Sequence, residues 1–301
     1  MRCATSRVHE RVQRSDSLIR TDAMRVLLLI LGLSGCGLAS PPVGEVVSPG
    51  VSRASFERRA NGTDLVPITV YFPADERGAP RAGPRPGVVF IQGGFVSTAR
   101  YSWQGIALAE AGYVVAMPDN ALQLAFFTVD YGQTARELLA SPPRGSLLDG
   151  LVDPQRIAVA GHSLGSVVAL KLALEGQFAA VVLQAGFPDG ADLPKLPAFT
   201  TPSLSLAGEL DCSAKLPDVR AGWDSLPSPT ALTVLTGVTH FEFTDSEAED
   251  LKRKCMPAKT LDEAHAAMRA AMVGFLDAAL SDGSVGEPAL RAVEGATVEV
   301  R

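Results

Sequence analysis

The sequence predicts one α/β domain, in which helices cover both faces of a mostly parallel sheet. The chain has 301 residues, of which 47% are hydrophobic and 20% are charged, so it is long enough to bury a large core. Beyond residue 87, apolar strand-like runs alternate with helical runs, which is typical of parallel strands joined by helices. A glycine-rich turn, Gly161-His-Ser-Leu-Gly165, joins one such strand to the next helix.

The predicted elements begin with an N-terminal antiparallel hairpin. Two strand-like runs, 52–59 and 65–72, flank Asn61-Gly62, a dipeptide that tight hairpin turns prefer. Further strands are expected at 88–91, 113–117, 157–160, 180–183, 203–207 and 232–235, and helices at 102–110, 128–139, 163–174 and 261–280. The segment between 183 and 203 is too short for a large cap domain.

The N-terminus has the pattern of an export signal. Met24-Arg25 precedes the apolar run 26–33, which is much shorter than the roughly 20 residues of a membrane-spanning helix. The run ends in Leu33-Ser-Gly-Cys36, which resembles the lipobox of bacterial lipoproteins and implies lipidation at Cys36. A plain signal peptide cleaved nearby is the alternative. We therefore expect an extracytoplasmic protein, attached by its lipid to the periplasmic face of a membrane or to the cell surface.

These patterns divide the chain into four segments. Residues 1–35 are expected to be an N-terminal extension and signal peptide, 36–51 a linker, 52–280 the folded catalytic domain, and 281–301 a flexible tail. Removal of the first segment would change the net charge from −6 to −9. No dense run of Lys and Arg indicates a nucleic-acid partner, and a monomer is the default expectation.

Ser163 is the candidate nucleophile. A Gly-x-Ser-x-Gly motif alone is a weak signal, but here a predicted strand precedes it and a predicted helix follows it, where a strained turn would expose the hydroxyl group. A Cβ at Gly161 or Gly165 would collide with neighbouring backbone in so sharp a turn. The alternative is an ordinary structural turn.

A serine hydroxyl needs a base to take its proton as it attacks, and His240 is the candidate for that base. Of the other histidines, His9 lies in the removed segment, His162 should point away from the serine, and His265 lies within the last predicted helix. His240 follows the last predicted strand on a loop, where the carboxyl ends of parallel strands meet.

Asp211 is the candidate acid that orients the imidazole, because it ends a short loop after the strand 203–207. Glu209, Asp218 and Asp224 are nearby alternatives.

Two backbone N–H groups are expected to hold the negative oxygen that develops on a substrate. The first belongs to Leu164, directly after the candidate nucleophile. The second should come from the loop Gln92-Gly-Gly-Phe95, where glycines let the backbone approach a substrate closely. A flexible turn without this role is the alternative.

Cys212 and Cys255 are the two cysteines outside the targeting region. They can form a disulfide in an oxidising compartment, and two free thiols are the alternative. A disulfide would join the loop of Asp211 to the segment after His240 and would stabilise the fold by about 2–4 kcal/mol. No cluster of His and Cys has metal-ligand spacing and no glycine-rich phosphate loop is present, so neither a metal nor an organic cofactor is expected.

These motifs resemble those of the α/β-hydrolase family over about residues 52–280, and within it those of the chlorophyllase and polyester-hydrolase (cutinase-like) group. The chain order Ser163, Asp211, His240 is the family's. The lead-in Asp153-Pro-Gln-Arg-Ile157 and the segment 103–120 are also similar to those of the family.

The resemblance implies that Gly94 supplies the second N–H group, at a position where these relatives often carry an aromatic residue. It also places Gln92 where the family commonly has His. Phe187 and Phe95 are expected to contact the substrate, although Phe187 is nearly as well explained as a core residue.

The function predicted from the sequence is hydrolysis of carboxylic esters through an acyl-enzyme intermediate, in an open cleft that accepts accessible or bulky esters. The same residues could cleave thioesters or amides, or transfer the acyl group to another alcohol. A lipoprotein that keeps this fold only for binding is the rival from another class.

Overall fold

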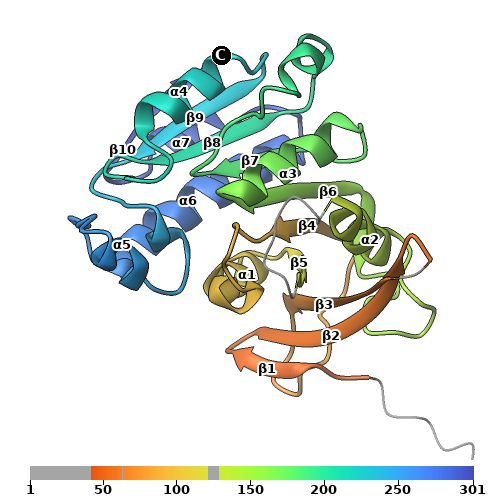
Figure 1. Cartoon of the computed structure of the whole chain (residues 1–301). Helices are drawn as coiled ribbons and strands as arrows, with labels where there is room; N and C mark the ends of the chain where they lie inside the picture. The colour runs from red at the N-terminus through yellow and green to blue at the C-terminus, as the bar shows by residue number, and fades with distance from the viewer. Residues whose placement is uncertain (1–41, 63, 121–128) are drawn as a thin grey trace, which may run out of the picture. The chain divides into compact units, whose positions relative to one another are not determined.

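A computed structural model describes residues 42–62, 64–120 and 129–301. In these residues ten strands form one sheet in the order β1-β2-β3-β5-β4-β6-β7-β8-β9-β10 (Figure 1). The predicted signal peptide, Cys36, the linker up to residue 41 and Thr128, the first residue of a predicted helix, lie outside the described residues.

The strands are β1 (Glu45–Ser48), β2 (Val51–Ala60), β3 (Asp64–Pro73), β4 (Arg85–Ile91), β5 (Val114–Pro118), β6 (Val152–His162), β7 (Val181–Gln184), β8 (Ser203–Gly208), β9 (Thr230–Leu235) and β10 (Ala296–Val300). The α-helices are α1 (Ser102–Glu110), α2 (Val129–Ala140), α3 (Leu164–Leu174), α4 (Leu216–Asp224), α5 (Ala248–Lys252), α6 (Leu261–Ala279) and α7 (Glu287–Arg291). The described residues also form the short 3-10 helices η1 (Thr98–Tyr101), η3 (Leu193–Ala198) and η4 (Phe241–Phe243).

The centre of the sheet is parallel and its edges are antiparallel. Strands β5, β4, β6, β7, β8 and β9 run parallel to one another. Strands β1, β2 and β3 pair antiparallel, and β3 joins β5 antiparallel. The central strands are continuous apolar runs because helices bury both of their faces. The predicted fold class is confirmed, including the N-terminal hairpin.

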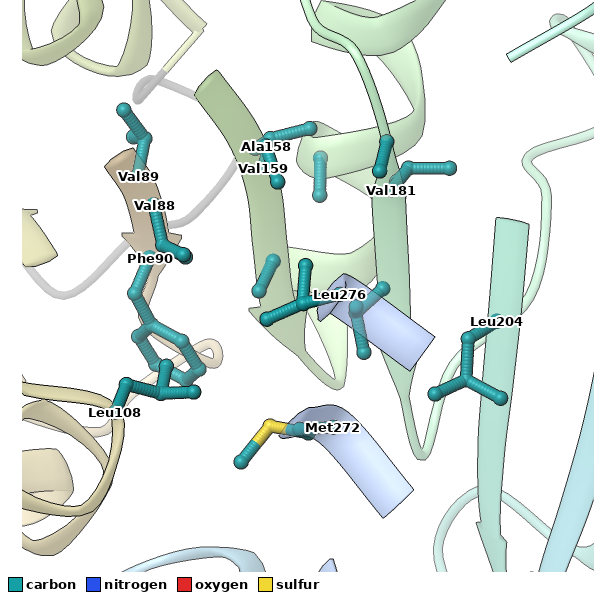
Figure 2. Packing of buried hydrophobic residues seen from close by; sticks show 14 of the residues in the cluster. Val88, Val89, Phe90, Leu108, Ala158, Val159, Val181, Leu204, Met272 and Leu276 are labelled. Atoms are coloured by element: carbon teal, nitrogen blue, oxygen red, sulfur yellow. The ribbon is translucent and has the colours of Figure 1, made fainter. Parts of the chain in front are cut away.

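The core lies between the sheet and its helices. Helix α1 packs against α6, and α2 packs against α3. Figure 2 shows Phe90 of β4 close to Leu108 of α1, with Met272 and Leu276 projecting from α6 toward the strands. This packing fixes the carboxyl ends of the parallel strands, where the candidate site residues were predicted.

The prediction of a flexible tail after residue 280 is wrong. Residues 287–291 form α7, and β10 pairs antiparallel with β9 as an edge strand. The guanidinium of Arg301 lies 3.9 Å from the centre of the Trp223 ring. The tail is ordered because the alternate residues Ala296, Val298 and Val300 pack against the core.

The predicted linker is also partly structured, since β1 pairs with the start of β2. Helix α4 was not predicted from the sequence. Between β7 and β8 the chain forms only the 3-10 helix Leu193–Ala198, so no helical cap covers the sheet in this segment. Among the described residues, no helix has the length and apolar character needed to cross a bilayer.

Candidate active site

Ser163 lies at a sharp turn between β6 and α3. Its φ of 57° and ψ of −123° are strained for a residue with a side chain. The turn is possible because Gly161 and Gly165 lack side chains: a Cβ at Gly161 would collide with the carbonyl oxygen of Gly165, and a Cβ at Gly165 with those of Ile91 and Gln92. The strand, the turn and the helix lie where the sequence predicts them.

Ser163, His240 and Asp211 meet at the carboxyl edge of the sheet. The Nε2 of His240 lies 3.1 Å from the Oγ of Ser163, and its Nδ1 lies 2.7 Å from the Oδ2 of Asp211. The other oxygen of Asp211 accepts the N–H groups of Ser213 and Ala214, each at 2.7 Å. Both His240 and Asp211 are buried, so the pair is shielded from water.

The three alternative acids do not make the contact to His240. Glu209 accepts the N–H of Gly237 at 2.9 Å, while Asp218 and Asp224 belong to α4. Of these four carboxylates, Asp211 is the one that bonds to the His240 ring.

The two residues expected to supply N–H donors lie against each other. Leu164 is the first residue of α3, where an N–H has no carbonyl one turn earlier to bond. No acceptor within the described residues takes the N–H of Gly94. A Cβ at Gly94 would collide with the side chain of Leu164, so this leucine fills the space beside the glycine. The buried Gln92 accepts the N–H of Asn120 at 3.3 Å and holds the base of the loop.

His162 connects the Gly94 loop to the His240 loop. The N–H of Gly93 donates to the Tyr101 hydroxyl at 2.9 Å, and that hydroxyl lies 2.9 Å from Nδ1 of His162. The Nε2 of His162 lies 3.1 Å from the carbonyl oxygen of His240, which can only accept. This contact therefore requires a proton on Nε2, and the Tyr101 hydroxyl can donate to Nδ1 of the neutral ring. Burial lowers the pKa of His162 well below its ordinary value, and the nearby His240 lowers it further.

Two buried carboxyl groups hold the backbone on either side of His240. The Oε2 of Glu242 accepts the N–H of Thr239 at 2.6 Å, and the Oδ2 of Asp250 accepts the N–H of Phe241 at 2.5 Å. The Thr239 hydroxyl lies 2.8 Å from the Glu242 oxygen and 2.9 Å from the Asp250 oxygen. One hydroxyl proton serves only one of these contacts, so the other contact needs a proton on a carboxyl group.

Burial raises the pKa of both Glu242 and Asp250. Both shifts favour the protonated form, so we expect the pair to share one proton through the Thr239 hydroxyl at a pH where exposed carboxyl groups are ionised.

A half-buried histidine holds the end of the same loop. The Nε2 of His265 lies 3.0 Å from the carbonyl oxygens of both Glu242 and Thr244, and its ring stacks on Trp103 with the ring centres 3.8 Å apart. The indole N–H of Trp103 donates to the carbonyl of Phe243 at 3.2 Å. Burial lowers the pKa of His265, so the neutral ring is favoured.

An apolar groove begins at Ser163. A cavity of about 200 Å³ is lined by Ser163, His240 and apolar side chains, and it adjoins a second cavity of about 290 Å³. The two cavities share Leu164, Val167 and Phe187. Phe187 is 39% exposed and lines both, so it is a wall of this groove and not a core residue.

Phe95 lies on a different side of the site. Its φ is 61°, and its side chain is 76% exposed. It lines a third cavity of about 450 Å³, together with Gly94, Phe241 and charged residues.

A disulfide joins Cys212 to Cys255 in the structure, with their Cα atoms 6.0 Å apart. It connects the residue that follows Asp211 to the segment that follows α5.

Several positioning residues were missed from the sequence. The pattern Thr239-x-x-Glu242 has the spacing of a capping box, in which the acid returns to the N–H of the threonine, and it was a usable signal. His162 was expected to point away from the serine, and its partners are indeed Tyr101 and the backbone of His240. No local pattern could have identified that connection, because its members come from distant parts of the chain.

A comparison with protein families places this geometry in a known group. The model of the alpha/beta hydrolase family matches residues 87–250, which is more than half of the chain and includes all three residues of the Ser163, His240 and Asp211 cluster. No curated protein matches the chain.

The shared proton predicts how stability changes with pH. Since the pKa values of Glu242 and Asp250 are raised on folding, the folded state holds more protons than the unfolded state above the ordinary carboxyl pKa. The contribution of these two groups to the free energy of unfolding should therefore fall as pH rises from about pH 4 toward the raised values. Asp250→Asn keeps an oxygen for the N–H of Phe241 but removes a titratable group, so the free energy of unfolding of this variant should lose that contribution to its pH dependence in chemical denaturation.

Glu137→Gln, at an exposed carboxylate of α2, is the matched control and should keep the wild-type slope. If Asp250→Asn also kept that slope, the shared proton would be ruled out.

Proposed function

Because the chain belongs to the α/β-hydrolase family, we propose that it is a serine hydrolase that cleaves carboxylic esters through an acyl-enzyme intermediate. The observation that carries the proposal is the continuous line of contacts from the Oγ of Ser163 to His240 and on to Asp211. This line supplies a nucleophile, a base within hydrogen-bonding distance, and an acid that fixes the tautomer of the base.

In the first half-reaction the Oγ of Ser163 attacks the ester carbonyl carbon. The Nε2 of His240 takes the hydroxyl proton and then gives it to the leaving alcohol. Asp211 accepts a hydrogen bond from the Nδ1–H of His240, which keeps Nε2 free to act as the base and stabilises the imidazolium that forms.

The N–H groups of Gly94 and Leu164 would stabilise the negative oxygen of the tetrahedral intermediate. Leu164 lies at the start of α3, where the helix also presents a partial positive charge. In the second half-reaction water, activated by His240, attacks the acyl-enzyme and releases the acid. We place the uncharged part of the substrate in the apolar groove beside Phe187.

We further propose that the chain is closest in activity to the chlorophyllase and polyester-hydrolase group, which its motifs resemble. The short segment between β7 and β8 supports this, because it leaves the groove uncovered by a helical cap. An uncovered groove accepts long or bulky esters whose ends extend into solvent.

The proposed location is outside the cytoplasm, with a lipid at Cys36 as the membrane anchor. The support is the sequence Leu33-Ser-Gly-Cys36 after a short apolar run. The Cys212–Cys255 disulfide in the structure agrees with an oxidising compartment.

Replacing the site residues tests the chemistry. Ser163→Ala should abolish covalent labelling by a fluorophosphonate, and Asp211→Asn should lower kcat for para-nitrophenyl butyrate by about three to four orders of magnitude, because the base would take the wrong tautomer. Labelling is measured by intact-protein mass spectrometry and kcat by steady-state kinetics.

The matched controls are Ser225→Ala and Glu209→Gln, which should both retain wild-type labelling and turnover. Equal labelling of Ser163→Ala and wild type would assign the nucleophile elsewhere. A near-normal kcat for Asp211→Asn would assign the acid elsewhere.

The disulfide should contribute to both stability and rate. Replacing Cys212 and Cys255 together by serine should lower the free energy of unfolding by about 2–4 kcal/mol and should also lower kcat, because the bond ties the loop of Asp211 to the region after His240. Wild type treated with a reductant should behave like the double variant. Alkylation of Cys212 and Cys255 in the unreduced, denatured protein, located by peptide mass spectrometry, would contradict the bond.

The anchor is tested with the full-length chain in a bacterial host. Cys36→Ser should move the protein from the membrane fraction to the soluble fraction, because the lipid attachment site is lost. Ser34→Ala, which retains the cysteine, should stay with the membrane. If Cys36→Ser remained in the membrane fraction, lipidation at this residue would not be the anchor.

A further inference from the structure

We propose that the cavity beside Phe95 binds a carboxylate group of the substrate, so that the enzyme prefers esters that carry a second, ionised carboxyl group. This inference rests on the proposed esterase function and specifies its substrate class.

The cavity lies beside the loop of Gly94 and beside Phe241, the residue that follows His240. Its volume is about 450 Å³. One wall is formed by Gly94 and Phe95 of the loop that would hold the oxyanion, and another by Phe241. The Phe241 ring packs edge-on against His240, with the ring centres 5.1 Å apart. A substrate whose carbonyl lies at Ser163 therefore has this cavity within reach of one of its ends, in addition to the apolar groove.

Two guanidinium groups line the cavity. Arg253 lies over the Phe241 ring at 5.0 Å from its centre, and its Nη1 donates to the Ser213 hydroxyl at 3.2 Å. Arg100 donates from Nη2 to the carbonyl of Ser246 at 3.3 Å, and its buried Nε has no acceptor within the described residues. Each guanidinium carries five N–H donors, so both arginines retain donors for a ligand.

Glu249, the one acidic side chain that lines the cavity, offsets only part of the charge of the two arginines. The carboxylate of Glu249 is paired with the Nζ of Lys252 at 2.5 Å. Asp245, whose N–H donates to the carbonyl of Arg100 at 2.7 Å, uses its carboxylate to accept the N–H groups of Ser102 and Trp103 at the start of α1. Since the whole chain has a net charge of −6, a cationic cavity beside the nucleophile stands out from the rest of the protein.

The chemistry of the lining favours a carboxylate on an apolar or aromatic spacer. A guanidinium matches the two oxygens of a carboxylate with parallel hydrogen bonds, and Phe95 and Phe241 provide apolar surface for the spacer. The neighbouring groove of Leu164, Val167 and Phe187 takes the uncharged part. The carboxylate can belong to the acyl part, as in a monoester of a dicarboxylic acid, or to the alcohol part, as in an acylated hydroxybenzoate.

The disulfide fixes this cationic site relative to the proposed acid. Arg253 is two residues from Cys255, which is joined to Cys212 beside Asp211. The backbone position of Arg253 is therefore tied covalently to that of Asp211.

The test uses two matched pairs of esters. The first pair places the charge on the acyl side: the mono-para-nitrophenyl ester of glutaric acid against para-nitrophenyl pentanoate. The second pair places it on the alcohol side: para-butyryloxybenzoate against its methyl ester. The measured quantity is the ratio of kcat/KM for the charged ester to kcat/KM for its neutral partner, at low and at high salt.

We expect wild type to show a ratio above one in one of the two pairs, falling as salt increases. Arg253→Gln and Arg100→Gln should each lower that ratio by about tenfold to a hundredfold, the loss expected for a hydrogen bond to a charged group. The change should appear in KM, while kcat/KM for the neutral ester stays constant. Lys254→Gln, which removes a neighbouring positive charge that does not line the cavity, should leave the ratio unchanged.

A second measurement separates this inference from the esterase proposal. The Ser163→Ala variant should bind para-butyryloxybenzoate in calorimetry, and the added Arg253→Gln change should weaken that binding by a similar factor. The carboxylate site would be overturned, and the esterase left standing, if wild type hydrolysed both neutral esters but its ratios of charged to neutral kcat/KM were one or below. Ratios that the arginine variants do not change would have the same meaning. Arginine-dependent binding without any hydrolysis would overturn the esterase and leave the site standing.

Discussion

The proposed chemistry requires that the imidazole of His240 is held against the Ser163 hydroxyl group, which comes from a different strand. Ser163 follows β6 and His240 follows β9, and two strands, β7 and β8, separate them in the sheet. The 3.1 Å contact between them therefore depends on the short loop after β9. Small displacements of a reacting group lower a rate strongly, so the loop must be held more firmly than an ordinary surface turn.

Buried side chains supply that restraint from both directions. His162 bonds to the carbonyl of His240, and His265 bonds to the carbonyls of Glu242 and Thr244. Glu242 and Asp250 take the N–H groups of the two residues that flank His240. Three of the four histidines in the chain thus belong to this loop or bond to it. Burial lowers the pKa of two of them, His162 and His265. The proposed base, His240, must itself gain and lose a proton. Neutral rings can hold it in place without adding a fixed positive charge beside it.

The sequence predicted the sheet and the turn at Ser163 because both follow from local patterns. Continuous apolar runs mark the central strands, and glycines mark the places where backbone atoms meet. The edge strands β1 and β10 escaped prediction because only one face of each packs on the core, which leaves a short, weak alternation such as Ala296 to Val300. The candidate residues Ser163, Asp211 and His240 could be selected by their places after strands. The support from Tyr101, His162 and Asp250 could not, since it depends on contacts between segments far apart in the chain.

The proposed acyl-enzyme can be trapped, and the residue that carries the acyl group can be identified. Wild-type protein turning over a para-nitrophenyl ester would be quenched in acid within the first turnover, digested, and analysed by peptide mass spectrometry. We predict an acyl group on the peptide that contains Ser163. The amount of acylated peptide should be larger in Asp211→Asn if water attack is slowed more than acylation. Ester turnover with no acylated peptide, or with the acyl group on another residue, would contradict this prediction.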